Sequence, residues 1–149
     1  SMRLLSINTR TDLALVEPLA SAQDFPFAKL QKSDDLSVGQ DILVVGHPYE
    51  DYFTVTTGII SKLVWSPFYF ARVIETTTLV LPGNSGGPAF NTEGEVIGIV
   101  SAMRMTPLRT PMGIGIIVPI KEIHTFLRSY ELLGKRSTQI KRYKLGDTK

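Results

Sequence analysis

Apolar residues along this chain fall into short runs that are rich in β-branched side chains and are separated by turn residues. Runs of this length and spacing are typical of strands in an antiparallel sandwich or barrel. We therefore expect strands at residues 13–16, 41–45, 53–60, 69–74, 96–100 and 113–118.

A helical rhythm follows the last of these runs. Its apolar positions recur at steps of three and four residues, as they do on one face of a helix: Ile120, Ile123, Phe126, Leu127 and Tyr130. Pro119 suits a first helical position, and Gly134 suits the end of the helix. The pattern predicts an all-β body that is closed by one C-terminal helix.

Composition narrows the class of protein. A chain of 149 residues is long enough for about one domain with a substantial core. Its 43% hydrophobic and 20% charged residues are ordinary for a globular protein, and no apolar run approaches the ~20 residues of a membrane span. The net charge of +2 is too small to indicate nucleic-acid binding. The segment 135–149 is rich in basic residues and lacks an apolar rhythm, so it is interpreted as a tail or linker.

Cysteine is absent, which removes several kinds of chemistry. The chain can have neither a disulfide framework nor a thiol nucleophile, and a structural zinc site is not expected without cysteine ligands. The residues imply no metal and no cofactor.

The most informative segment is the loop Gly83-Asn84-Ser85-Gly86-Gly87-Pro88. A serine hydroxyl becomes a strong nucleophile when a base takes its proton, and backbone N–H groups can stabilise the negative charge that develops on the substrate. Gly83 and Ser85 can present two such N–H groups, because glycine turns its amide freely. The competing interpretation is a glycine-rich hairpin with an incidental serine. A phosphate-binding loop is excluded, because the Gly-Lys-Ser/Thr of that motif does not follow.

This loop and five other segments, in the same order along the chain, resemble the chymotrypsin-like serine proteases and, within them, the HtrA/Deg branch. The segments are 11–16, 38–48, 54–61, 82–88, 94–100 and 113–120. The resemblance covers residues 9–133 and implies two Greek-key β-barrels with the active site between them. By this resemblance, residues 1–35 would be the last part of the first barrel, 36–118 the complete second barrel, 119–134 the C-terminal helix and 135–149 the tail or linker.

The resemblance assigns catalytic roles to two residues. Ser85 would be the nucleophile of a trypsin-like serine endopeptidase, and the N–H groups of Gly83 and Ser85 would form the oxyanion hole. Asp12 would orient the base through a buried carboxylate. A turn or cap residue is the alternative role for Asp12, although the Leu-Ala-Leu-Val that follows it resembles the family's strand.

The general base is the missing element. The family places its histidine well before the aspartate, yet no residue ahead of Asp12 is histidine. His47, in a Gly-His-Pro turn, is interpreted as a locally hydrogen-bonded turn residue, and His124 as a partly exposed residue of the helix. We therefore expect an incomplete triad and weak catalysis. Most of the first barrel could be missing, it could be a separate or disordered segment, or the protein could have lost catalysis.

The resemblance also places a specificity pocket. Its floor lies six residues before the nucleophile, at Leu79, and neither this residue nor its neighbour is acidic, so cleavage after Arg or Lys is not expected. The expected pocket residues are Leu79, Val80, Val100, Ser101, Ala102, Gly113, Ile114 and Gly115. Such apolar walls favour a small-to-medium aliphatic side chain, with discrimination of about 1–3 kcal/mol per methylene.

Functions of different kinds remain open. The first is a serine endopeptidase domain that acts on polypeptides. The second is a non-catalytic module of the same fold that binds a peptide or partner in the former active-site cleft. A third and weaker alternative is an esterase on another fold. Relatives of the HtrA/Deg type often act outside the cytoplasm and as trimers, so the resemblance implies a periplasmic or secreted protein that forms a homo-oligomer.

Overall fold

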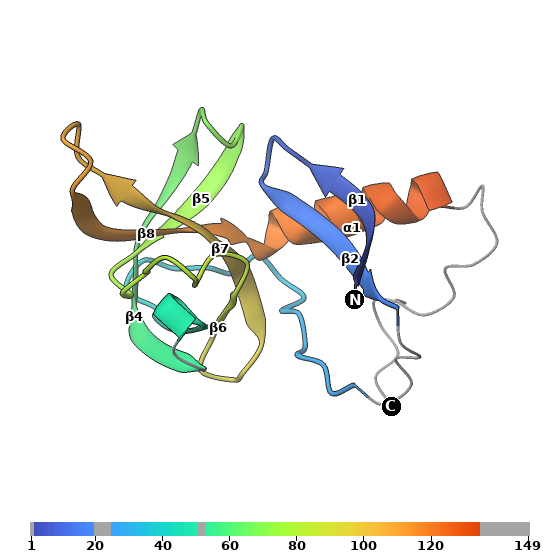
Figure 1. Ribbon diagram of the computed structural model, residues 1–149, viewed down its shortest axis with the longest axis horizontal. Coiled ribbons are helices and arrows are strands. Elements are labelled where there is room, and N and C mark those ends of the chain that lie inside the picture. The colour runs from blue at the N-terminus through green and yellow to red at the C-terminus, as the bar shows by residue number, and fades with distance from the viewer. Residues whose placement is uncertain (1, 20–24, 51–52, 135–149) are drawn as a thin grey trace.

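Six strands close into a barrel in the computed structural model, which describes residues 2–19, 25–50 and 53–134 (Figure 1). Their order around the barrel is β3-β4-β5-β8-β7-β6, and all neighbours are antiparallel. A short 3-10 turn, η1 (Pro48–Glu50), follows the first barrel strand. The strands are β3 (Asp41–Gly46), β4 (Thr54–Ser66), β5 (Ala71–Thr76), β6 (Pro88–Phe90), β7 (Val96–Met105) and β8 (Pro111–Pro119).

A two-stranded ribbon and one helix lie beside this barrel. The ribbon consists of β1 (Met2–Asn8) and β2 (Leu13–Pro18), and the helix is α1 (Ile120–Gly134). Figure 1 shows the ribbon and α1 side by side at one end of the barrel. Within the described part of the chain, no helix has both the length and the apolar character needed to cross a membrane.

Two apolar clusters hold these parts together. The barrel core fills the interior, and the wall cluster lies between the outer face of the barrel, the ribbon and α1. Both faces of the second half of β8 are buried, which explains its continuous apolar run. The barrel core contains Ile42, Val44, Ile60, Ile74, Val80, Ala89, Ile97, Val100 and Ile117. The wall cluster contains Leu13, Tyr69, Ala71, Val73, Ile116, Val118, Ile120, Ile123 and Phe126.

The predicted fold class is confirmed, with differences at element boundaries. Each expected strand overlaps an observed one, but β1 and β6 have no counterpart in the prediction. The helix begins one residue later than expected, because Pro119 pairs with Gly98 at the end of β8. The predicted tail at 135–149 lies outside the described residues.

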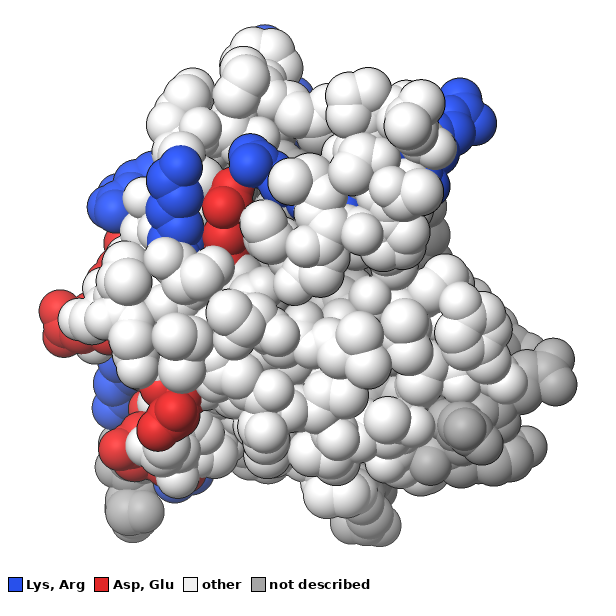
Figure 2. All heavy atoms as spheres, turned by 90° about the vertical axis from the view of Figure 1, so that its left-hand side faces the viewer, with Lys and Arg blue, Asp and Glu red and all other residues white. Residues whose placement is uncertain are grey.

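The ends of the barrel hairpins carry exposed apolar side chains. Phe68 and Phe70 lie in the turn between β4 and β5, and Leu108 lies in the turn between β7 and β8. Figure 2 views the side of the molecule on which these hairpins lie, and most of that face bears neither acidic nor basic side chains. The acidic groups of this view lie toward its left margin, and basic groups lie both there and at the upper right.

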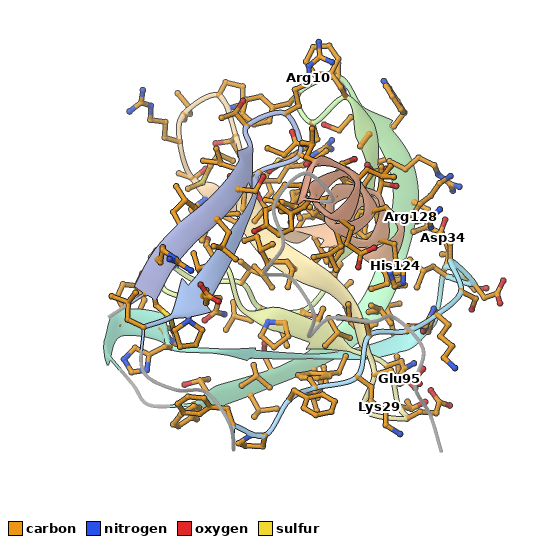
Figure 3. The ribbon with its side chains drawn as sticks, turned by 90° about the vertical axis from the view of Figure 1, so that its right-hand side faces the viewer. Arg10, Lys29, Asp34, Glu95, His124 and Arg128 are labelled. Carbon is orange, nitrogen blue, oxygen red and sulfur yellow. The ribbon has the colours of Figure 1, made fainter. Side chains whose placement is uncertain are left out.

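The segment that leads into the barrel is anchored on two sides. The backbone of Gln31 donates to the carbonyl of Val96 at 3.0 Å, and its side chain accepts from Asn91 at 3.0 Å. Its own carbonyl lies 2.7 Å from Nε2 of His124 on α1 (Figure 3). The expectation of a partly exposed His124 is therefore wrong, because this bond holds the ring in a buried position between α1 and the segment.

Ile97 gives a direct test of the barrel core. The side chain is fully buried, so Ile97→Ala should reduce the free energy of unfolding by about 2–5 kcal/mol, from lost transfer energy and a residual cavity. The matched substitution Ile7→Ala, at an exposed site on β1, should change it by less than about 0.5 kcal/mol. Urea unfolding of both variants measures the difference, and equal losses would contradict this account of the core.

Candidate active site

The turn between β1 and β2 presents Asp12. The side-chain oxygen of Asn8 accepts from the backbone N–H groups of Arg10 at 3.0 Å and Thr11 at 3.3 Å, which tightens the turn. Asp12 then adopts a left-handed backbone conformation with φ of 56°, which aspartate tolerates better than most residues. Leu13 follows in the wall cluster, so the position of Asp12 is fixed by a buried neighbour.

Ser101 on β7 brings Asp12 and Ser85 together. Its hydroxyl donates to Oδ2 of Asp12 at 2.5 Å, and its backbone carbonyl accepts from Oγ of Ser85 at 2.9 Å. The hydroxyl of Tyr69 lies 2.9 Å from Oγ of Ser101. A serine has one proton to give, so Tyr69 donates to Ser101, and Ser101 donates to Asp12. Both predicted triad residues therefore contact one residue.

Two features of this arrangement differ from expectation or were missed. Asp12 is exposed, whereas a buried carboxylate was expected, because it projects from the turn of a two-stranded ribbon. Ser101 was assigned only to the pocket, and Tyr69 was assigned only to a strand. The position of Ser101, polar within the apolar run of β7, was the available signal for another role.

The predicted nucleophile loop, residues 83–88, is hydrogen-bonded to β7. The N–H of Gly86 donates to the carbonyl of Val100 at 2.7 Å, and the N–H of Val100 donates back to Gly87 at 2.9 Å. Among the described residues, no hydrogen bond uses the backbone N–H of Gly83 or Ser85, which leaves both donors available to a ligand.

Close contacts explain the glycine at position 83. Its φ is 103°, and a Cβ there would lie 2.3 Å from the carbonyl oxygen of His47, so an L-residue would be both strained and overcrowded. His47, in the Gly-His-Pro turn, is exposed, and its backbone carbonyl packs against this loop.

The predicted pocket residues are divided between core and surface. Val80 and Val100 belong to the barrel core, Leu79 and Gly113 are exposed, and Gly115 is buried. The other three, Ser101, Ala102 and Ile114, are half-buried.

Close packing at Gly115 joins the expected floor to the expected wall of the pocket. A Cβ at Gly115 would lie 2.5 Å from a methyl group of Val80. The same residue pairs with Met103, which continues the strand of Ser101 and Ala102.

A buried carboxylate lies close to β7 and β8, the strands that carry the expected pocket walls. Glu75 on β5 is opposite Ile116 on β8, which in turn pairs with Ala102 on β7. Its Oε1 lies 2.9 Å from a guanidinium nitrogen of Arg104, although the angles do not make a hydrogen bond. Because this carboxylate already has a cationic partner, it does not supply a free negative charge for a basic substrate side chain.

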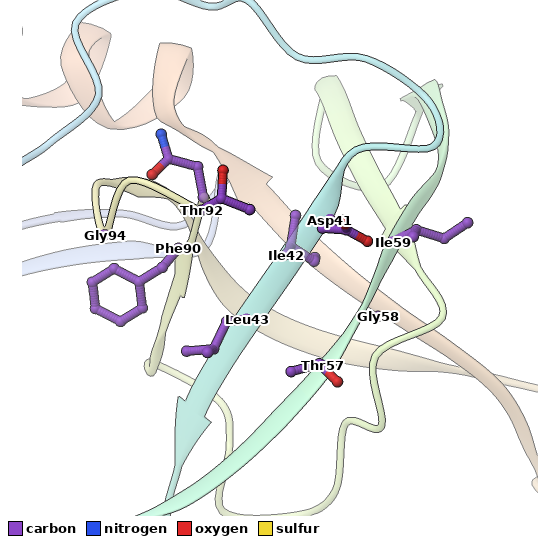
Figure 4. A pocket seen from close by; sticks show the side chains of 10 residues that line it. Asp41, Ile42, Leu43, Thr57, Gly58, Ile59, Phe90, Thr92 and Gly94 are labelled. Carbon is purple, nitrogen blue, oxygen red and sulfur yellow. The ribbon is translucent and has the colours of Figure 1, made fainter.

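A separate pocket lies on the outside of β3 and β4. Its volume is about 660 Å³, and none of the residues around Ser85 lines it (Figure 4). Its lining includes Asp41, Leu43, Thr57, Ile59, Phe90 and Thr92.

Gly83→Ala and Gly86→Ala form a matched pair, since both glycines have positive φ. A Cβ at Gly86 would have no heavy atom within 4 Å, whereas one at Gly83 would overlap the carbonyl of His47. We expect Gly83→Ala to lower the free energy of unfolding by about 1–3 kcal/mol more than Gly86→Ala, which is the range for overpacking. Equal losses in thermal unfolding would show that His47 does not restrict the loop.

Comparison with known proteins agrees with this geometry. The family described as trypsin-like peptidase domain matches residues 2–99. A Marinomonas sp. protein named "Probable periplasmic serine endoprotease DegP-like" is 40% identical over 137 residues, covering 91% of this chain and 29% of its own length. A protein of the same name from Rickettsia conorii is 34% identical over 143 residues, covering 92% of this chain and 28% of its own. The chain thus spans less than a third of these curated relatives.

Solved structures have the same architecture. The HtrA-type protease AlgW with a decapeptide aligns with a TM-score of 0.76 and 30% identity over 89% of this chain and 41% of that one. The serine endoprotease from Yersinia pestis aligns with a TM-score of 0.75 and 28% identity, over 89% and 45% respectively. This chain belongs to the trypsin-like peptidase family and, within it, to the HtrA-type branch.

Proposed function

We propose that this chain is the part of a serine endopeptidase that supplies the nucleophile, the aspartate, the oxyanion donors and the specificity pocket. The observation that carries the proposal is the pair of contacts at Ser101, which hold Asp12 and Ser85 on one residue. A glycine-rich hairpin with an incidental serine would not require this link to an aspartate on a separate sheet.

The reaction follows from these positions. A general base takes the proton of Ser85 Oγ as that oxygen attacks the substrate carbonyl carbon, and the N–H groups of Gly83 and Ser85 stabilise the oxyanion. Collapse of the intermediate breaks the peptide C–N bond, and the base returns its proton to the departing amine. Water then hydrolyses the acyl-enzyme by the same route.

The base is proposed to be a histidine other than the two in this sequence. His124 is held by the carbonyl of Gln31 on the far side of the segment that enters the barrel, and its ring is buried there. His47 follows β3 in the turn that supports Gly83. Without a further histidine, only the weak rate enhancement of an oxyanion hole is expected from this chain.

Cellular context is inferred from the relatives. Because the similar curated proteins are named periplasmic endoproteases, we infer an extracytoplasmic protein with polypeptide substrates. Assembly into a homo-oligomer, a trimer by resemblance to the branch, is part of the same proposal.

Covalent labelling tests the assignment of Ser85. In the longest native form of the protein, a fluorophosphonate probe should label the wild type, and Ser85→Ala should abolish that labelling. Ser61→Ala, at an exposed serine on β4, should leave it unchanged. Mass spectrometry locates the adduct. No adduct on a form that contains an additional histidine before Asp12 would instead favour a non-catalytic module that binds peptides in the cleft.

Cleavage of a peptide library tests the pocket. Leu79, Ala102 and Ile114 offer apolar groups, and Gly115 leaves little depth beside Val80. Aliphatic residues of small to medium size should therefore be preferred before the scissile bond, with only ~10- to 200-fold discrimination per methylene. Preferred cleavage after Arg would refute this specificity and would point to Glu75 as an accessible carboxylate.

A further inference from the structure

A set of threonine hydroxyls connects β4 to the chain that precedes the nucleophile. Thr76 Oγ1 donates to the carbonyl of Ile59 at 2.9 Å, and the N–H of Ile59 donates to Oγ1 of Thr77 at 3.0 Å. The hydroxyls of Thr76 and Thr78 lie 2.7 Å apart and are fully buried. Side-chain bonds thus continue the contact between β4 and this segment beyond the last pair of the ladder, Ile60 with Thr76.

A further threonine, Thr56 on β4, bonds to Leu79. Its carbonyl oxygen accepts from Oγ1 of Thr56 at 3.1 Å and from the side-chain amide of Asn84 at 3.4 Å. A carbonyl oxygen has two lone pairs, so one atom can accept both bonds. Asn84 is 1% exposed and lies between Gly83 and Ser85, the two residues with available N–H groups.

The surroundings of Asn84 restrict it further. A Cβ at Gly46 would lie 2.3 Å from Oδ1 of Asn84, so the end of β3 packs directly against this side chain. The carboxamide therefore has little room to turn. The backbone N–H of Asn84 donates to the carbonyl of Leu81 at 3.0 Å, and the side-chain bond to Leu79 is a second link between the loop and the preceding segment. A shift of the Leu79 carbonyl would thus act on Asn84 through its side chain.

We propose that Thr56 is a positioning residue for the oxyanion hole, an inference that rests on the proposed function. Within the described part of the chain, Thr56 shares no hydrogen bond with Ser85 or Asp12. It donates to the Leu79 carbonyl, which also accepts from the side chain of Asn84. The anchor is a strand of 13 residues built into the barrel, whereas the loop itself is a turn. The hydroxyl of Thr56 thereby transfers the rigidity of β4 to the N–H groups of Gly83 and Ser85.

Thr56→Val tests this role, because valine keeps the shape and removes the hydroxyl. In the longest native form of the protein, kcat should fall about tenfold, the effect of roughly one hydrogen bond, with KM changed less than about twofold. Thr56→Ser should restore kcat. Thr57→Val is the matched control, since Thr57 is exposed on the opposite face of β4 and should keep wild-type kinetics.

Two outcomes would overturn the positioning role. These are equal kcat values for Thr56→Val and Thr57→Val, or a loss in Thr56→Val that Thr56→Ser does not rescue. Hydrolysis by the wild type in either case would leave the proposed function intact. A wild type that hydrolyses no peptide would overturn both.

Amide hydrogen exchange on this chain gives a readout that needs no catalysis. If Thr56 restrains the loop, Thr56→Val should accelerate exchange at Asn84 and Gly87, whose N–H groups donate to the carbonyls of Leu81 and Asn84, by about tenfold relative to Thr57→Val, at matched unfolding free energy. Accelerated exchange confined to this loop supports positioning. Unchanged exchange in the loop, or acceleration spread evenly over the barrel, contradicts it.

Discussion

The wall cluster is the contact on which the candidate active site depends. Leu13 directly follows Asp12, and Tyr69, which also belongs to the cluster, bonds to the hydroxyl that holds Asp12. Burial of a leucine side chain contributes about 1.5–3 kcal/mol, whereas a hydrogen bond contributes about 0.5–1.5 kcal/mol net. Apolar packing of the ribbon on the barrel therefore dominates, and it places the carboxylate for the weaker polar contact with Ser101.

Neighbouring backbone shapes the nucleophile loop more than the loop's own preferences do. The carbonyl of His47 restricts one side of it, and Val100 on β7 bonds to the other side. Glycine at position 83 is compatible with that crowding because it has no Cβ. The predicted oxyanion donors thus owe their positions to the turn after β3 and to strand β7, which flank the loop.

Sequence patterns predicted the elements with strong periodicity and failed where neighbours decide. The long apolar runs of β7 and β8 were found, but the three residues of β6 include Pro88 and are too short for a pattern. The predicted exposure of His124 was wrong, because the pattern along α1 does not reveal the segment that packs over this residue. Ser85 and Asp12 were identified by resemblance to the family, whereas the link through Ser101 needed three-dimensional contacts between β7 and the ribbon.

Strand β6 is the seam of the barrel, and it begins shortly after Ser85. Only two residue pairs, Leu43 with Phe90 and Val44 with Ala89, join it to β3 and complete the closed circuit of strands. Opening of that seam would release the downstream end of the nucleophile loop at the same moment. Local opening of the barrel would then also disturb the geometry of the candidate active site, so selection for that geometry would also select for a tightly closed barrel.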